Sequence, residues 1–97
     1  TAADQLSSDL ALARSIAVSQ SQVIFFEGFG TNYRITNPTS GRIIRARDYP
    51  DEVRLTVDVS INFFPWGAAE ATTLNLNNGH EVRRLQVLPT GIVEVSP

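Results

Sequence analysis

The chain has 97 residues, of which 42% are hydrophobic and 19% are charged. This length and composition indicate one globular domain and exclude an intrinsically disordered chain. The net charge of −2 argues against a strongly basic nucleic-acid surface, although it leaves room for a local basic patch. The chain has no cysteine, which excludes disulfides and thiolate chemistry.

The first element in the sequence is an amphipathic helix, expected from residue 3 to residue 19. Its apolar face is a set of residues at spacings of four, three and four: Leu6, Leu10, Ala13 and Ala17. Because half of these side chains are alanines, we expect this face to lie close against a flat partner such as a sheet. The polar side chains are expected away from that face: Ser7, Ser8, Asp9, Arg14 and Ser15.

Short runs of strand-forming residues, separated by turns, occupy the rest of the chain from about residue 22 to residue 95. The expected strands are Val23–Glu27, Tyr33–Thr36, Arg42–Arg47, Val53–Phe63, Ala71–Leu76, Val82–Leu88 and Ile92–Val95. The first strand is apolar up to Phe26, so we expect it to be covered on both faces.

The clearest strand signal runs from Val53 to Phe63, where apolar and polar residues alternate strictly. Such alternation places the large apolar side chains on one face of a sheet. A strand of this length is unusual, so we expect a bend or break near residues 58–60. The sequence therefore predicts an α+β fold: a single domain of residues 1–97, with one N-terminal helix packed on an antiparallel β-sheet of about six to eight strands.

No group of residues in the sequence predicts catalysis. His80 is the only histidine, and neither a second histidine nor a cysteine is present to complete a zinc site. Asp48, Asp51 and Glu52 could share a calcium ion, but their spacing matches no EF-hand loop, and a solvated turn is the simpler interpretation. We therefore expect no catalytic residue, no metal ion, no cofactor and no small-molecule substrate.

Three blocks of the sequence resemble the minor pseudopilin family of type II secretion and type IV pili, the GspH/FimT group. The blocks read "LARSIAVSQSQVIF", "INFFPWG" and "RRLQVLPTGIVEVS". The matching residues are Ala13, Arg14, Ser15, Ala17, Ile61, Phe63, Gly67, Leu85, Val87, Gly91 and Val93. Two departures stand out: Ile16 occupies a position that is often Glu in the family, and the family's N-terminal hydrophobic helix and prepilin-peptidase cleavage site are absent from this sequence.

The resemblance implies a pilin-like fold and a function in assembly rather than in catalysis. It implies a structural subunit at or near the tip of a pseudopilus or pilus, where it acts in filament initiation and protein secretion. The implied partners are other pilins or pseudopilins of the same filament. The resemblance also implies a periplasmic domain of a longer, single-pass protein, whose missing N-terminal helix crosses the bacterial inner membrane.

Two groups of residues are candidates for contacts with such partners. Phe64 is out of phase with the alternating strand before it, and Trp66 follows in a Pro-Trp-Gly turn. Large aromatic side chains often anchor interfaces, but a tryptophan folded back over the edge of the core is an equally good interpretation. The second group is the exposed side of the helix near Ser8 and Arg14.

DNA binding is an alternative function, because some members of this family take up DNA. Those members use a C-terminal Gly-Arg-x-Arg stretch, which is absent from the "TGIVEVSP" that ends this sequence. Arg45 and Arg47 share one face of a strand, and Arg42 stands nearby. If Ile44 and Ala46 point inward, the guanidinium groups of Arg45 and Arg47 point to solvent, where they could contact phosphates. Three such contacts would give only weak binding near physiological salt.

Overall fold

The computed structural model describes residues 1–96 and consists of one helix and two four-stranded antiparallel sheets. The helix α1 spans Ala2–Gln20. The first sheet has the order β3-β2-β1-β5 and consists of β1 (Ile24–Gly28), β2 (Asn32–Asn37), β3 (Arg42–Asp48) and β5 (Val59–Phe63). The second has the order β4-β6-β7-β8 and consists of β4 (Arg54–Leu55), β6 (Thr72–Asn77), β7 (Val82–Val87) and β8 (Val93–Ser96). The predicted α+β architecture is therefore confirmed, with eight strands.

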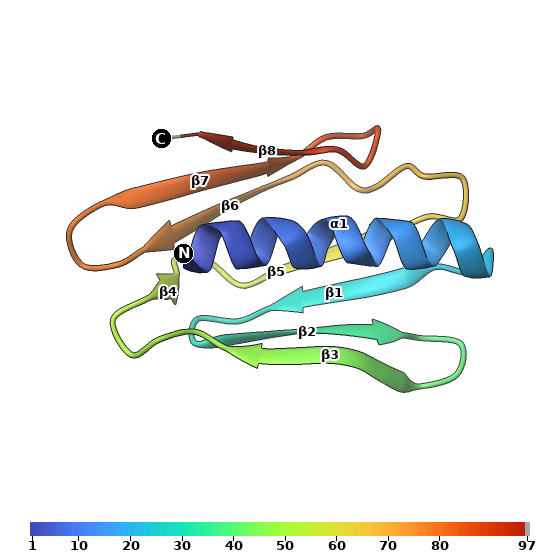
Figure 1. Cartoon of the computed structure of the whole chain (residues 1–97), viewed down its shortest axis with the longest axis horizontal. Coiled ribbons are helices and arrows are strands. Elements are labelled where there is room, and N and C mark those ends of the chain that lie inside the picture. Colours follow the sequence, from blue (N-terminus) through green and yellow to red (C-terminus); the bar gives the residue numbers. More distant parts are fainter. Residues whose placement is uncertain (97) are drawn as a thin grey trace.

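Helix α1 lies across the junction of the two sheets, as Figure 1 shows. It packs against β1 and β5 of the first sheet and against β7 and β8 of the second. The four residues predicted for its apolar face are all fully buried: Leu6, Leu10, Ala13 and Ala17. The same hydrophobic core also contains Ile24 and Phe26 of β1 and Leu85 of β7. One helix therefore covers both sheets with a single face.

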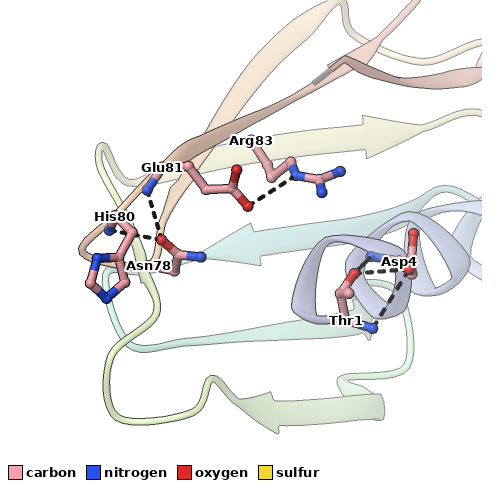
Figure 2. A network of polar contacts seen from close by, with 6 residues as sticks. All are labelled: Thr1, Asp4, Asn78, His80, Glu81 and Arg83. Atoms are coloured by element: carbon pink, nitrogen blue, oxygen red, sulfur yellow. Dashed lines mark hydrogen bonds and ion pairs between the residues drawn. The ribbon is translucent and has the colours of Figure 1, made fainter.

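Both ends of α1 are closed by local hydrogen bonds. At its start the Thr1 hydroxyl accepts a hydrogen bond from the Asp4 amide at 3.2 Å, as in a typical N-cap (Figure 2). At its end Ser21 adopts a left-handed conformation with φ 54°, and the Gln22 amide donates to the Ala17 carbonyl. This turn sends the chain into β1 after only three residues that belong to neither element, so the helix runs almost directly into the middle of a sheet.

The alternating stretch from Val53 to Phe63 forms two strands in different sheets. Residues 54–55 form β4 beside β6, whereas residues 59–63 form β5 beside β1. The chain crosses between the sheets at residues 56–58, slightly before the break expected at residues 58–60. Val57 lies in this crossing and is 69% exposed, so it does not share the buried face of Leu55 and Ile61.

Strand β1 is buried fully on one face only. Ile24, Phe26 and Gly28 are buried toward the helix, whereas Phe25 on the opposite face is partly exposed. The expectation of full cover on both faces is therefore wrong. The outer face of β1 carries Phe25 and Glu27, which are both partly exposed between the neighbouring strands β2 and β5.

The close approach of α1 to the sheets can be tested by enlarging its buried alanines. Ala13→Leu and Ala17→Leu should each lower the free energy of unfolding by about 1–3 kcal/mol, because the added carbons have no free space in a packed layer. The matched control is Ala11→Leu, which adds the same atoms at an exposed position of the same helix. Chemical denaturation measures all three, and equal stability of the buried and exposed variants would contradict this packing.

Candidate functional site

The first candidate surface is an aromatic pair in the loop between β5 and β6, in which Trp66 is exposed and Phe64 is partly exposed. The rings of Phe64 and Trp66 stack with centroids 5.0 Å apart and planes 4° from parallel. Trp66 is 75% exposed, so the alternative in which it folds back over the core is wrong. The loop is closed by hydrogen bonds from the Phe64 amide to the Ala68 carbonyl and from the Gly67 amide to the Phe64 carbonyl. We call Phe64 and Trp66 the aromatic pair.

Arg14 of α1 holds this loop in place. Its Nε donates a hydrogen bond of 2.9 Å to the carbonyl oxygen of Gly67. Gly67 and Gly91 both have positive φ, and a Cβ on Gly91 would overlap the Gly67 oxygen and lie 2.6 Å from Arg14 Nε. Arg14 is therefore partly buried where the helix, the β5–β6 loop and the β7–β8 turn meet, rather than exposed as the sequence suggested.

A shallow groove of about 420 Å³ lies between Trp66 and the helix. Trp66 and Gly67 line one side, and exposed helix residues line the other: Ala11, Ser15, Val18 and Ser19. Val18 is 46% exposed. Ser8 lies one turn nearer the start of the helix and is exposed, as predicted. The candidate contact residues thus lie on and beside the outer face of α1.

The second candidate site is a charged cluster around Asp9, which sequence reasoning placed on the polar side of the helix. Asp9 is only 2% exposed. Its carboxylate accepts hydrogen bonds from the Tyr33 hydroxyl at 2.5 Å, from Arg45 Nη1 at 2.9 Å and from Arg47 Nε at 2.6 Å. These partners come from β2 and β3, so one side chain of α1 is tied to two strands. We call these four residues the Asp9 cluster.

Arg45 and Arg47 of β3 point toward Asp9 of α1, so the prediction that they point to solvent is wrong. The register between β2 and β3 shifts by one residue near Ile44, since Ile35 pairs with Arg45 but Thr36 pairs with Ile43. Such a bulge changes which face the following residues occupy. Arg45 and Arg47 consequently face α1, whereas Ala46 is exposed. Arg42 precedes the bulge and lines a different hollow, so the structure does not gather the three arginines into one patch.

Three aromatic rings in contact, with planes tilted by 37° and 44°, continue the Asp9 cluster into the core. Phe26 and Tyr33 have centroids 5.5 Å apart, and Tyr33 and Tyr49 have centroids 5.4 Å apart. Burial, followed by the hydrogen bond to Asp9 and its negative charge, raises the pKa of Tyr33. Burial alone raises the pKa of Tyr49, whose buried hydroxyl has no hydrogen-bond partner among residues 1–96.

The polar residues that the sequence singled out for other chemistry lie apart from these surfaces. His80 is exposed in the β6–β7 turn, where the Asn78 side chain accepts hydrogen bonds from the amides of His80 and Glu81 (Figure 2). Asp48, Asp51 and Glu52 are exposed. Within residues 1–96, no three histidines or acids come together as a metal would require, and no helix has the length and apolar character needed to cross a membrane.

The family model described as "Type II transport protein GspH" matches residues 2–91, which include α1, the aromatic pair and the Asp9 cluster. The chain belongs to the GspH family. Two crystal structures of the type IV minor pilin FimU from Pseudomonas aeruginosa PAO1 share its fold, each with a TM-score of 0.81 over 99% of this chain. Sequence identity to them is 24% and 23%, and 86% and 90% of those chains are covered. No curated protein matches the chain significantly in sequence.

Family membership puts the two sites in the context of a pilin fold. Arg14, Gly67 and Gly91 are among the residues that carry the sequence resemblance, and the structure brings these three together. Asp9, by contrast, lies outside the three resembling blocks. The signal that could have revealed it is the presence of two arginines at period-two spacing, which need an acidic partner if their face is turned inward.

The raised pKa values predict an unusual alkaline titration. Tyr33 and Tyr49 are the two tyrosines of the chain. In the folded domain both should stay protonated at pH 10.0, which is the ordinary pKa of a tyrosine. Since the folded pKa is the higher one, the contribution of these two tyrosines to stability should be fully present below pH about 10 and be lost as the pH rises above it. Absorbance at 295 nm and circular dichroism, recorded together, should change in one transition.

The control for this titration is the chain in concentrated urea, whose tyrosines should ionise near pH 10. Phenolate absorbance that develops near pH 10 while the folded circular dichroism signal persists would contradict the burial of these hydroxyls.

Proposed function

We propose that this chain is a minor pilin, a structural subunit at or near the tip of a type II secretion pseudopilus or a type IV pilus. In this role it acts in filament initiation and in protein secretion, and its partners are other pilins or pseudopilins of the same filament. Membership of the GspH family and the fold shared with the minor pilin FimU support the proposal.

The observation that carries an assembly role is the exposed Trp66 of the aromatic pair. A tryptophan that is 75% exposed contributes little to the core, yet its loop is tied to α1 by the hydrogen bond from Arg14 to the Gly67 carbonyl. Rigid, exposed aromatic side chains are typical interface anchors, because they bury a large area with little loss of conformational entropy. We assign the aromatic pair, with Arg14 and Ser8 on the neighbouring helix, to contacts with an adjacent subunit.

We further propose that the domain lies in the periplasm and that a hydrophobic helix preceding α1 anchors it in the inner membrane. The resemblance to the pseudopilin family supports this arrangement. The upstream sequence tests it: a Gly-Phe or Gly-Met cleavage site, a glutamate five residues later and about twenty apolar residues are expected. An upstream sequence without an apolar segment would contradict the anchor.

A DNA-binding minor pilin is the alternative function, with Arg42, Arg45 and Arg47 as phosphate contacts. Arg42 is exposed and supports it. The ion pairs of Arg45 and Arg47 with Asp9 weigh against it, because they leave a surplus of only one positive charge between the two arginines, which is little for a run of phosphates. The net charge of −2 also weighs against it.

Replacing Trp66 tests the assembly role without disturbing the core. Trp66→Ala should leave the free energy of unfolding within about 0.5 kcal/mol of wild type, because the side chain is exposed. In the full-length protein it should reduce pilus number or type II secretion at least about tenfold, the effect expected for an interface anchor. Pilus counts by electron microscopy, or secretion of an exported enzyme, measure this effect.

The matched control is Val57→Ala, which truncates another exposed apolar side chain, 69% accessible, in the crossing between the two sheets. Wild-type assembly by both variants would contradict the role assigned to the aromatic pair. Trp66 is the only tryptophan, so a change in its fluorescence on mixing with purified domains of other minor pilins provides a direct second readout.

A further inference from the structure

The Asp9 cluster carries more positive than negative charge. Arg45 and Arg47 contribute two positive charges and Asp9 contributes one negative charge, which leaves an excess of one positive charge. The Asp9 side chain is 3% exposed, whereas those of Arg45 and Arg47 are 39% and 33% exposed. The buried carboxylate is therefore satisfied, and the surplus charge faces outward.

The two guanidinium groups also retain unused hydrogen-bond donors. A guanidinium has five N–H groups in a planar fork that fits a carboxylate. Within residues 1–96, Arg45 donates one side-chain hydrogen bond and Arg47 donates one, both to Asp9. Because Asp9 fixes both side chains from the inside, their remaining donors are held in position at the surface.

These donors border an open groove of about 680 Å³ between the first half of α1 and strand β3. Its lining includes Gln5 and Ser8 of the helix and Pro50 after β3, together with the two arginines. Asp4 also lines it, but its carboxylate is 77% exposed and accepts a hydrogen bond from the Thr1 hydroxyl (Figure 2). The groove thus joins the arginines to Ser8, on the outer face of the helix.

We propose that this groove receives the carboxylate of an aspartate or glutamate from a neighbouring pilin subunit, bound by the outward N–H groups of Arg45 and Arg47. One carboxylate would neutralise the surplus charge of the cluster, and the two arginines offer the fork geometry that carboxylates prefer. The assignment of the partner rests on the proposed function. A single protein carboxylate fits better than a nucleic acid, because the surplus of the cluster is one positive charge, whereas a run of phosphates brings several negative charges beside Asp4, which lines the same groove.

Sodium acetate, titrated into the ¹⁵N-labelled domain at constant ionic strength, tests the site directly. The Nε–H signals of Arg45 and Arg47 should shift with a saturable dependence on acetate, whereas the exposed Arg42 and Arg54 should respond as they do to sodium chloride. Arg45→Gln should abolish the saturable shift while leaving Asp9 bound to Arg47 and Tyr33. The matched control is Arg54→Gln, which removes an exposed arginine elsewhere and should preserve the shift.

Asp9→Asn should strengthen acetate binding, whereas Arg45→Gln should abolish it. The change to asparagine keeps the side-chain shape but raises the surplus charge from one to two, so acetate should bind about tenfold more tightly. If that variant does not fold, the comparison of wild type, Arg45→Gln and Arg54→Gln still decides the question. Nε–H shifts that are equal at all arginines and do not saturate with acetate would contradict the proposed site.

A 12-base-pair DNA duplex in the same titration separates the two macromolecular ligands. No saturable shift is expected from it at micromolar concentration, and micromolar DNA binding at Arg45 and Arg47 would overturn the assignment to a protein carboxylate. In the full-length protein, Arg45→Gln should impair filament assembly more than Arg54→Gln does. Normal assembly by Arg45→Gln would overturn this contact, whereas the minor-pilin function itself is tested separately by Trp66→Ala.

Discussion

The burial of one carboxylate, Asp9, constrains how the helix sits on the sheets. A charged group at 2% exposure must be paired, and the hydroxyl of Tyr33 with the guanidinium groups of Arg45 and Arg47 supplies all its partners. On the opposite flank of the apolar face, Arg14 binds the carbonyl of Gly67. Asp9 and Arg14 are five residues apart, about 140° around the axis at about 100° per residue. The helix is therefore held from both flanks, which fixes its rotation.

This arrangement links the stability of the domain to its two candidate contact surfaces. On one flank, the bond from Arg14 to Gly67 fixes the loop that exposes Trp66. On the other, Asp9 fixes the inner edges of Arg45 and Arg47 and leaves their outer edges exposed. The apolar face between them supplies most of the favourable energy of packing, whereas the polar flanks determine the orientation of the helix. Both surfaces border the outer face of α1.

Sequence periodicity was sufficient to predict the helix, its buried face and most strands, because these depend on local spacing. It was insufficient for Val53–Phe63, since alternation defines the faces of a strand but not which sheet each half joins. Asp9 was placed on the wrong side because its partners lie 24 to 38 residues away, and only the folded sheet brings them together. The predicted orientation of Arg45 and Arg47 was wrong because a one-residue bulge in β3 changes the face that they occupy. The composition of the strand does not reveal this bulge.

The most direct test of this account is the stability of Asp9→Ala relative to Asp4→Ala, measured by urea denaturation at neutral pH. Both substitutions remove one carboxylate from the first half of α1, but Asp4 is exposed and Asp9 is buried. Asp9→Ala should lower the free energy of unfolding by about 3 kcal/mol, because it leaves the buried Tyr33 hydroxyl and two arginines without their acceptor, whereas Asp4→Ala should lower it by less than about 1 kcal/mol. An Asp9→Ala domain as stable as wild type would contradict this account.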